Sequence, residues 1–431
     1  MPARSPTTGP AACLLAVCAA AGPVALRADP PKPDACVECH REQDEKALID
    51  PVRLMENDVH RAAGFSCADC HGGDPAVPED ANPYTESKDK AKGYRGSPDR
   101  KDVAVLCARC HSDIQFMRKY NPRIRVDQHM EYLTSRHGEL VGKGDRKAAT
   151  CTSCHGAHGI RKVKDPAAPV YPVNVPALCA RCHADPETMK EYEVGTRQVE
   201  SYLHSQHGVR LLKERDTGAP SCGTCHGNHG AAPPGTASVA HVCGNCHGVQ
   251  AEDFEQSAHA AHFALRKLPL CASCHDPHAT PKPGDHLLTD APGGVCNTCH
   301  QKGDPCYLAT GRMLEAIRSF AQARDEAARE IDRAERLGMS VSQAKFDLAE
   351  VEDSLTKARV KIHRFHEADV TDTLRPGLAT IERVRERARE ALEEHAFRRK
   401  GLAVSAALIL LTVGLLVLKI RRIERTPRGG G

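Results

Sequence analysis

The sequence Cys151-Thr152-Ser153-Cys154-His155-Gly156-Ala157-His158 contains a pattern that recurs along most of the chain. The order Cys, two residues, Cys, His occurs nine times between Cys36 and His300. Two cysteines three positions apart lie on one face of a helical turn, and the histidine follows directly. The cysteine pairs are Cys36 and Cys39, Cys67 and Cys70, Cys107 and Cys110, Cys151 and Cys154, Cys179 and Cys182, Cys222 and Cys225, Cys243 and Cys246, Cys271 and Cys274, and Cys296 and Cys299. The histidines are His40, His71, His111, His155, His183, His226, His247, His275 and His300.

This pattern attaches c-type haem, because the two thiols form thioethers with one haem and the histidine binds its iron. Eighteen of the 21 cysteines belong to the motifs, which leaves Cys13, Cys18 and Cys306. Zinc ribbons and disulfide frameworks also use paired cysteines, but neither requires a histidine after every second cysteine. The sequence therefore predicts nine covalently bound haem c groups, with the 18 cysteines as thioether residues and the nine histidines as proximal iron ligands.

Twelve histidines of the haem region lie outside the motifs, enough to bind the far side of every iron. Seven recur by position and are the favoured distal ligands, with a solvated surface histidine as the alternative for each: His60, His137, His158, His207, His229, His259 and His278. Three of them follow a proximal histidine by three residues, which is the same helical face, so each is expected to serve a neighbouring haem. His241, His262 and His286 are further candidates, whereas His129 and His204 have no positional counterpart.

The haem region is internally repeated. The segment Tyr132–Gly138 matches Tyr202–Gly208. After the first motif, the other eight form four pairs, and a lone histidine precedes each pair. This arrangement indicates a repeated dihaem module. With these Ser-x-His-Gly and CxxCHxxH elements, residues 36–300 resemble the membrane-anchored multihaem cytochromes c. That resemblance implies export and a histidine on both sides of most irons. Eight Phe, eight Tyr and no Trp make a poor aromatic core, so we expect the haems to fill the interior of residues 29–305.

Both ends of the chain carry apolar segments. Residues 1–28 read as a cleaved export signal, although Leu15-Ala16-Val17-Cys18 loosely resembles a lipoprotein box. Residues 401–420 contain the uncharged run Leu402–Leu418, long enough for one membrane span. Three basic residues precede the run and five follow it, Lys419, Arg421, Arg422, Arg425 and Arg428, so the tail 421–431 is expected in the cytoplasm. The haem region would then lie in the periplasm. A buried helix of a soluble domain is the alternative.

The composition changes abruptly after the haem region, and residues 306–400 are rich in Ala, Glu, Arg and Leu. Helices are expected from about Ala309 to Leu337, along the apolar seam Val341 to Phe365, and from about Leu378 into the span. The seam favours a coiled-coil stalk, formed either within one chain or between subunits. These helices resemble those of octahaem hydroxylamine oxidoreductases and pentahaem nitrite reductases. His363 and His366 end the second helix, where they either reach a haem or face solvent.

The fold class is therefore mainly α with extensive irregular loops: a nonahaem cytochrome c domain, a helical stalk and one transmembrane helix. Two functions fit. One is electron transfer between a membrane oxidoreductase or quinol pool and a periplasmic acceptor. The other is reduction or oxidation of a small nitrogen or sulfur species at one haem with an open site. The absence of CxxCK and the surplus of histidine favour transfer, and the net charge of +3 gives no reason to expect a nucleic-acid partner.

Overall fold

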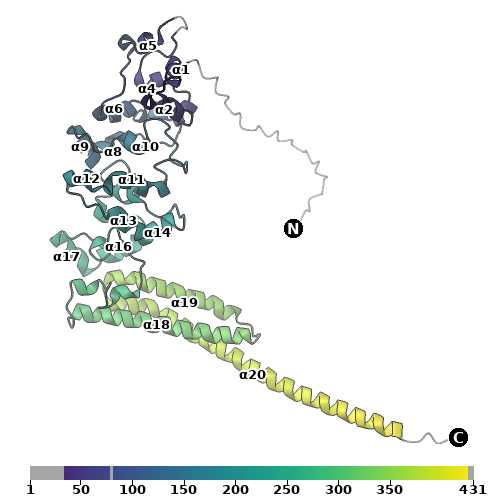
Figure 1. Cartoon of the computed structure of the whole chain (residues 1–431). Helices are drawn as coiled ribbons and strands as arrows, with labels where there is room; N and C mark the ends of the chain where they lie inside the picture. The colour runs from purple at the N-terminus through teal and green to yellow at the C-terminus, as the bar shows by residue number, and fades with distance from the viewer. Residues whose placement is uncertain (1–33, 78–80, 426–431) are drawn as a thin grey trace, which may run out of the picture. The chain divides into compact units, whose positions relative to one another are not determined.

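The computed structural model describes residues 34–77 and 81–425, and the regular structure in these residues is entirely helical (Figure 1). Short α-helices and 3-10 helices are joined by irregular loops, and no strand occurs in the described part of the chain. The prediction of a mainly α fold is thus confirmed. The export signal, Cys13, Cys18 and Arg428 lie outside the described residues. The chain divides into two compact units, Met1–Ile124 with Ala149–Ala168, and Arg125–Ala148 with Pro169–Gly431.

The first unit holds the first four motifs on short helices. They are α1 (Ala35–Arg41), α2 (Lys46–Met55), α3 (Val59–Ala62), α4 (Cys67–His71), α5 (Pro83–Glu86), η1 (Lys90–Lys92), α6 (Arg100–His111), α7 (Ile114–Met117) and α10 (Cys151–His155). The buried carboxylate of Asp58 joins two segments of this unit, since it accepts from the backbone N–H of His60 at 2.8 Å and of Ile160 at 2.7 Å. Such capping satisfies N–H groups that a short helix leaves unpaired.

The second unit holds the other five motifs, followed by the long helices. Its shorter elements are α8 (Gln128–Thr134), α9 (Arg136–Gly142), η2 (Pro172–Asn174), α11 (Val175–His183), α12 (Pro186–Met189), η3 (Lys190–Tyr192), α13 (Gln198–His204), α14 (Gln206–Leu212), α15 (Cys222–His226), η4 (Val239–Asn245), α16 (Gly248–Glu255), α17 (Ala258–Arg266), η5 (Cys271–Ser273), η6 (Asp285–Leu288), η7 (Cys296–Thr298) and η8 (Ile362–Arg364).

The repeated Ser-x-His-Gly element forms the same corner twice, between α8 and α9 and between α13 and α14. The hydroxyl of Ser135 accepts from the N–H of Gly138 at 3.0 Å, and Ser205 caps Gly208 at the same distance. A Cβ on either glycine would lie 2.0 Å from the carbonyl oxygen of the tyrosine six residues earlier. Only glycine fits so close a backbone approach. The corner begins the helix that carries the lone histidine of each module.

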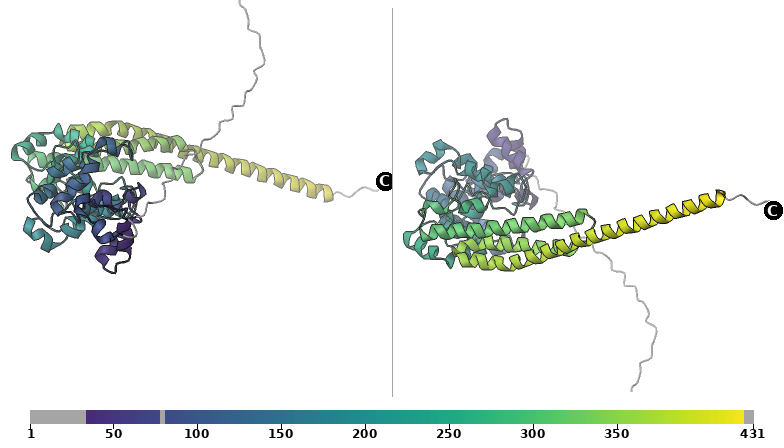
Figure 2. Two further views of the ribbon diagram at one scale, coloured as in Figure 1. Left: turned by 90° about the horizontal axis from the view of Figure 1, so that it is seen from above. Right: turned by 90° about the horizontal axis from the view of Figure 1, so that it is seen from below.

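Three long helices form a bundle, α18 (Pro305–Arg336), α19 (Ser342–Lys361) and the first part of α20 (Glu367–Arg425), which run side by side in both views of Figure 2. Their shared core includes Ile317, Phe320, Val351, Leu355 and Val384, none more than 1% exposed. Most of the largest fully buried side chains of the described residues belong to this bundle. The described residues of the haem region have fewer large, fully buried side chains.

The predicted seam on the second helix faces this core. Ala344, Val351, Leu355 and Ala358 are buried, and Leu348 packs against the same cluster. The seam is thus used within one chain. The third helix begins at Glu367, earlier than expected, and runs through Pro376.

Helix α20 continues beyond the bundle as a single exposed helix. It is the one helix among the described residues that is long and apolar enough to cross a membrane, with a mean hydropathy of 2.6 over an 18-residue window. None of that window is buried against protein. The predicted run Leu402–Leu418 therefore remains the candidate for a membrane span.

Candidate haem-binding sites

The motifs lie on short helical turns that place both cysteines on one side. In motifs two, four and six the turn has a reciprocal cap. Ser66, Thr150 and Ser221 precede the first cysteine, and the backbone N–H of each donates to a side chain three residues later, at 2.7 to 3.1 Å. This capping box starts the helix at the first cysteine. The helix ends at the histidine, where a glycine with positive φ follows. The last three motifs begin on 3-10 turns instead.

The cysteines of neighbouring motifs approach one another, and none of those described forms a disulfide. The first cysteines of consecutive motifs lie close to each other, as in the pairs Cys36–Cys67, Cys107–Cys151, Cys179–Cys222 and Cys243–Cys271. Second cysteines interact electrostatically with the next motif, as Cys70 does with Cys110 and Cys274 with Cys296. Within each unit, successive motifs therefore lie next to each other in chain order.

The second cysteines of the motifs differ in burial. Cys70, Cys182, Cys246 and Cys299 are exposed, whereas Cys39 is half-buried. Because a motif turn is short, the protein chain covers its second cysteine incompletely. Their thioether role stays a prediction from the motif, and the haem edges that they would hold lie toward solvent.

Seven proximal histidines face a second histidine of the same unit at ring-centroid distances of 5.9 to 6.3 Å. The pairs are His111–His60, His71–His158, His183–His137, His247–His207, His226–His278, His300–His259 and His275–His363. Two imidazoles bound to one metal through bonds of about 2 Å have centroids about 6 Å apart. The spacing thus fits one iron between each pair.

Hydrogen bonds at Nδ1 of several histidines leave Nε2 as the nitrogen that can bind a metal. His71 donates its Nδ1–H to the carbonyl of Gly96 at 2.8 Å, and His363 donates to Val360 at 2.8 Å, because a carbonyl oxygen can only accept. His60 Nδ1 lies 3.0 Å from the carboxylate of Asp58. In each case Nε2 remains available, the arrangement in which a neighbouring acceptor orients a metal-binding histidine.

Desolvation favours the neutral form of several paired imidazoles, which is the form that binds a metal. Desolvation lowers the pKa of His111, His137, His183 and His275, and the facing histidine lowers it further in His111, His137 and His275. His259 is an exception in its hydrogen bonding. Its Nδ1 is buried without a partner, and the ring of Phe365 lies over it with centroids 4.0 Å apart.

The pairs follow a regular order along the chain. The lone histidine before two motifs faces the second of the two, as His60 faces His111 and His207 faces His247. A histidine three residues after a motif faces the histidine two motifs earlier, as His278 faces His226. His158 and His278 therefore lie opposite another motif and not opposite their own, as helix geometry predicts.

The pair His275–His363 connects the eighth motif to the bundle, and sequence reasoning did not include His363 among its preferred ligands. The surrounding contacts hold this corner. Lys361 donates to the buried carboxylate of Asp253 at 2.7 Å, and Arg359 forms two bonds of 2.9 Å with Asp285. No local motif marks His363, since its only signal is its place at the end of an amphipathic helix.

The contacts of the other candidate histidines vary. His40 Nδ1 lies 3.1 Å from the carbonyl of Leu48, and no histidine ring faces His40 among the described residues. His229 Nδ1 lies 3.9 Å from the carboxylate of Glu131. His241, which contacts Ser238 at 2.9 Å, faces no proximal histidine in the described part of the chain, and the same holds for His262 and His286.

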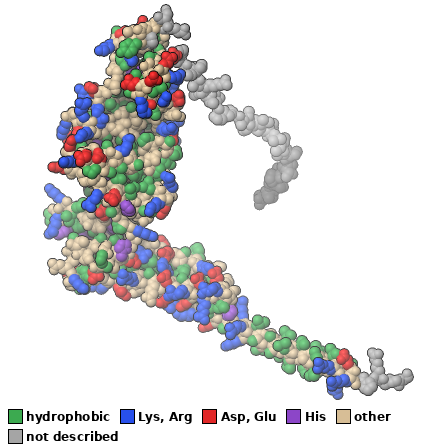
Figure 3. Space-filling view, viewed as in Figure 1, with side chains coloured by type: hydrophobic (Ala, Val, Ile, Leu, Met, Phe, Trp, Pro, Cys, Tyr) green, Lys and Arg blue, Asp and Glu red, His purple; other side chains and the backbone are tan. Residues whose placement is uncertain are grey.

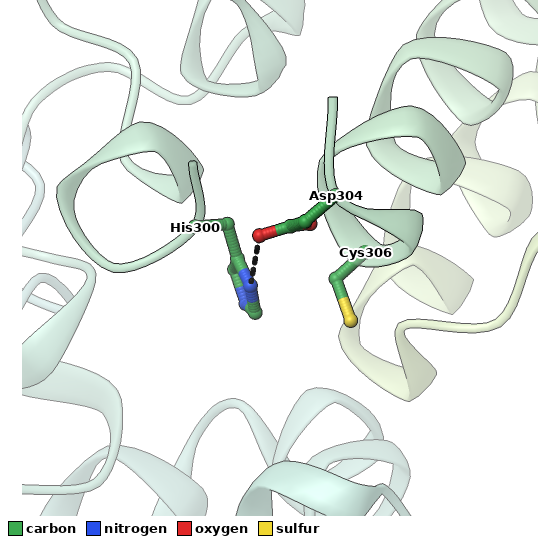
Figure 4. Close-up of side chains that lie close together, drawn as sticks. All are labelled: His300, Asp304 and Cys306. Carbon is green, nitrogen blue, oxygen red and sulfur yellow. Dashed lines mark ion pairs between the residues drawn. The ribbon is translucent and has the colours of Figure 1, made fainter. Parts of the chain in front are cut away.

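Asp304 supports the last motif (Figure 4). Its carboxylate lies 3.6 Å from Nδ1 of His300, and Cys306 is close to both. The same carboxylate accepts from the N–H of Tyr307 at 2.6 Å and of Gln301 at 2.9 Å, so it caps α18. These bonds lower the pKa of Asp304. The group therefore fits a carboxylate that orients a haem ligand better than a separate metal site.

Two family models match parts of the chain. The model described as cytochrome c3 matches residues 59–184, which hold motifs two to five. The model described as a doubled CXXCH motif matches residues 262–305, which hold the last two motifs. No curated protein and no solved structure gives a match. Together with the motif turns and the facing histidines, these matches support a multihaem c-type cytochrome with covalently bound haem c.

Proposed function

We propose that the chain is a periplasmic, membrane-anchored conduit that carries electrons through nine haems. The electrons pass between a membrane oxidoreductase or quinol pool and a periplasmic acceptor. The main support is the repeated pairing of facing histidines, such as His71 with His158 and His183 with His137. Haem supplies one-electron chemistry when bound, and its potential depends on ligands, burial and hydrogen bonds. The chain holds the ligands and orients them.

The order of the motifs supports continuous transfer. Within each unit, the cysteines of one motif lie next to those of the following motif, as Cys36 does to Cys67 and Cys243 to Cys271. Because these cysteines bear the haem edges, successive haems would be held close together. A protein that aligns carriers in this way serves transfer between distant partners, and histidine on both sides of an iron leaves no position for a substrate.

The length of the bundle restricts which membrane partner can reach the last haems. Helix α18 has 32 residues, or about 48 Å at 1.5 Å per residue. Its first turn lies beside His300, whereas its last turn packs beside Leu392–Lys400, where the apolar run begins. A quinol within the bilayer is therefore not expected to reduce the last haems directly. We propose that the partner at this end is a redox protein with a domain outside the membrane.

Protein-film voltammetry of the full chain tests this proposal. We expect reversible oxidation and reduction of all haems, without a catalytic current on addition of nitrite, hydroxylamine or sulfite. A sustained catalytic current with any of these would favour the enzyme over the conduit.

A second candidate function rests on His40. Its ring faces no histidine in the described residues, and residues 1–35 contain no histidine. Each later pair of motifs is preceded by a lone histidine, whereas no histidine precedes the first motif. We propose that this haem binds a small ligand, which is the property a reductase or oxidase needs. Titration of the reduced full chain with carbon monoxide should then show binding at this haem.

Comparison of two haem-deletion variants locates the binding. Cys36→Ala/Cys39→Ala should lose this carbon monoxide, whereas Cys107→Ala/Cys110→Ala should retain it. Equal binding by both variants would contradict the assignment to the first motif.

A further inference from the structure

A cavity of about 450 Å³ lies at the end of the bundle, directly before the apolar run of α20. The last turn of α18 and a segment of α20 form it. Four cationic side chains line it, Arg333, Arg336, Arg399 and Lys400, together with apolar Leu337, Leu392 and Ala396 and with His395. Lys and Arg side chains gather where the bundle gives way to the apolar stretch in Figure 3.

These four cations differ from most others on the bundle. Most other cations on the bundle form ion pairs, such as Lys345–Glu335 at 2.7 Å and Lys357–Asp353 at 2.6 Å. Arg398, next to the cavity, pairs with Glu394. In contrast, Arg333, Arg336, Arg399 and Lys400 make no ion pair with any described residue, and no carboxylate lines the cavity. The unpaired charges repel one another unless an anion lies between them.

The position of the cavity identifies the anion. Lys400 is followed by Gly401 and then by side chains that are largely exposed, including Leu402 at 70% and Val404 at 61%. If this run crosses a membrane, the cavity lies at the level of the phospholipid headgroups. A phosphate there would meet the cations, and the start of an acyl chain would meet Leu337, Leu392 and Ala396. Basic residues beside a span attract anionic lipid.

We propose that this cavity binds the headgroup of an anionic phospholipid and so fixes this end of the bundle at the membrane surface. The proposal rests on the proposed membrane anchoring. The lipid phosphate lies among the guanidinium groups of Arg333 and Arg336 and the side chains of Arg399 and Lys400. Bidentate contacts from arginine suit a phosphate diester. The bound lipid would hold the end of α18 against α20 at the membrane.

The test uses the full, haem-loaded chain in a neutral detergent. Binding of short-chain phosphatidylglycerol, phosphatidylcholine and inorganic phosphate is measured by native mass spectrometry. We expect saturable binding of phosphatidylglycerol, weakened roughly 30-fold by Arg333→Gln/Arg336→Gln. The matched control, Lys357→Gln/Arg375→Gln, removes the same charge from ion pairs elsewhere on the bundle and should bind as the unaltered chain does.

Three results would overturn the proposal: equal binding of the two lipids, equal weakening by both variants, or inorganic phosphate bound as tightly as phosphatidylglycerol. A carbonate wash of native membranes tests the membrane anchor independently of the headgroup site. Release of the full chain would contradict the anchor. A chain that stays bound but shows no lipid preference would contradict only the headgroup site.

Discussion

His363, at the end of the second stalk helix, faces His275 of the eighth motif with ring centroids 6.2 Å apart. The bundle is therefore more than a spacer, since it contributes to a haem site. Replacing His363 by Ala should convert one of the nine haems to a high-spin form without loss of covalent haem, because the thioethers are untouched. His366→Ala is the control, since this ring is exposed and faces no proximal histidine among the described residues. Equal electron paramagnetic resonance spectra for both variants would contradict the assignment.

The ion pair between Lys361 and Asp253 should stabilise the same corner. Asp253 is 3% exposed, so removal of its partner leaves a buried charge unpaired. We expect Lys361→Ala to lower the free energy of unfolding by about 1–3 kcal/mol. Lys357→Ala on the same helix breaks only an exposed pair and should cost less than about 1 kcal/mol. Chemical denaturation of the two variants measures the difference.

Gly377 allows α20 to pack against the other helices. A Cβ at this position would lie 2.6 Å from Cζ of Phe320 and 2.9 Å from Cβ of Ser354. Gly377→Ala should therefore destabilise the bundle by about 1–3 kcal/mol. Gly311→Ala, where a Cβ meets nothing within 4 Å, should stabilise α18 by about 0.5–1 kcal/mol. A similar unfolding midpoint for both variants would show that the close packing at Gly377 does not exist.

Truncation before Phe397 should release a soluble protein that keeps its haems. The bundle core ends before this point, with Val384 and Ala388 among its last buried residues. The removed part contains the exposed apolar run. Fractionation of cells and haem staining provide the measurement. A truncated chain that stays with membranes after a high-salt wash would place the anchor elsewhere, with lipidation at Cys18 as the leading alternative.

Each motif is complete, so the mature protein should carry nine covalent haems. Mass spectrometry of the intact, denatured chain counts them directly, because thioether bonds survive denaturation. Alkylation of free thiols before digestion then shows whether each second cysteine is used, above all the exposed Cys70, Cys182, Cys246 and Cys299. A fully matured chain with fewer than nine haems, or with one of these thiols alkylated, would show that a CxxCH motif is not fully used.

The sequence predicts those parts of the fold that depend on residues close together in the chain. Nine CxxCH patterns, the Ser-x-His-Gly corners and the 3-4 spacing along α19 each specify nearby geometry. The rule that His158 cannot serve its own motif also follows from one helical turn. His363 could not be ranked above other histidines, because its partner His275 lies far away in the sequence. The pairing depends on how the bundle packs against α16, through contacts such as Lys361–Asp253.

Electron paramagnetic resonance of the fully oxidised full chain, before and after addition of nitrite, distinguishes electron transfer from catalysis at an open haem. We predict low-spin signals with two histidine ligands for at least the seven irons whose facing histidines are described, unchanged by nitrite. High-spin intensity from more than two of the nine haems, shifted by nitrite, would contradict a protein built for electron transfer.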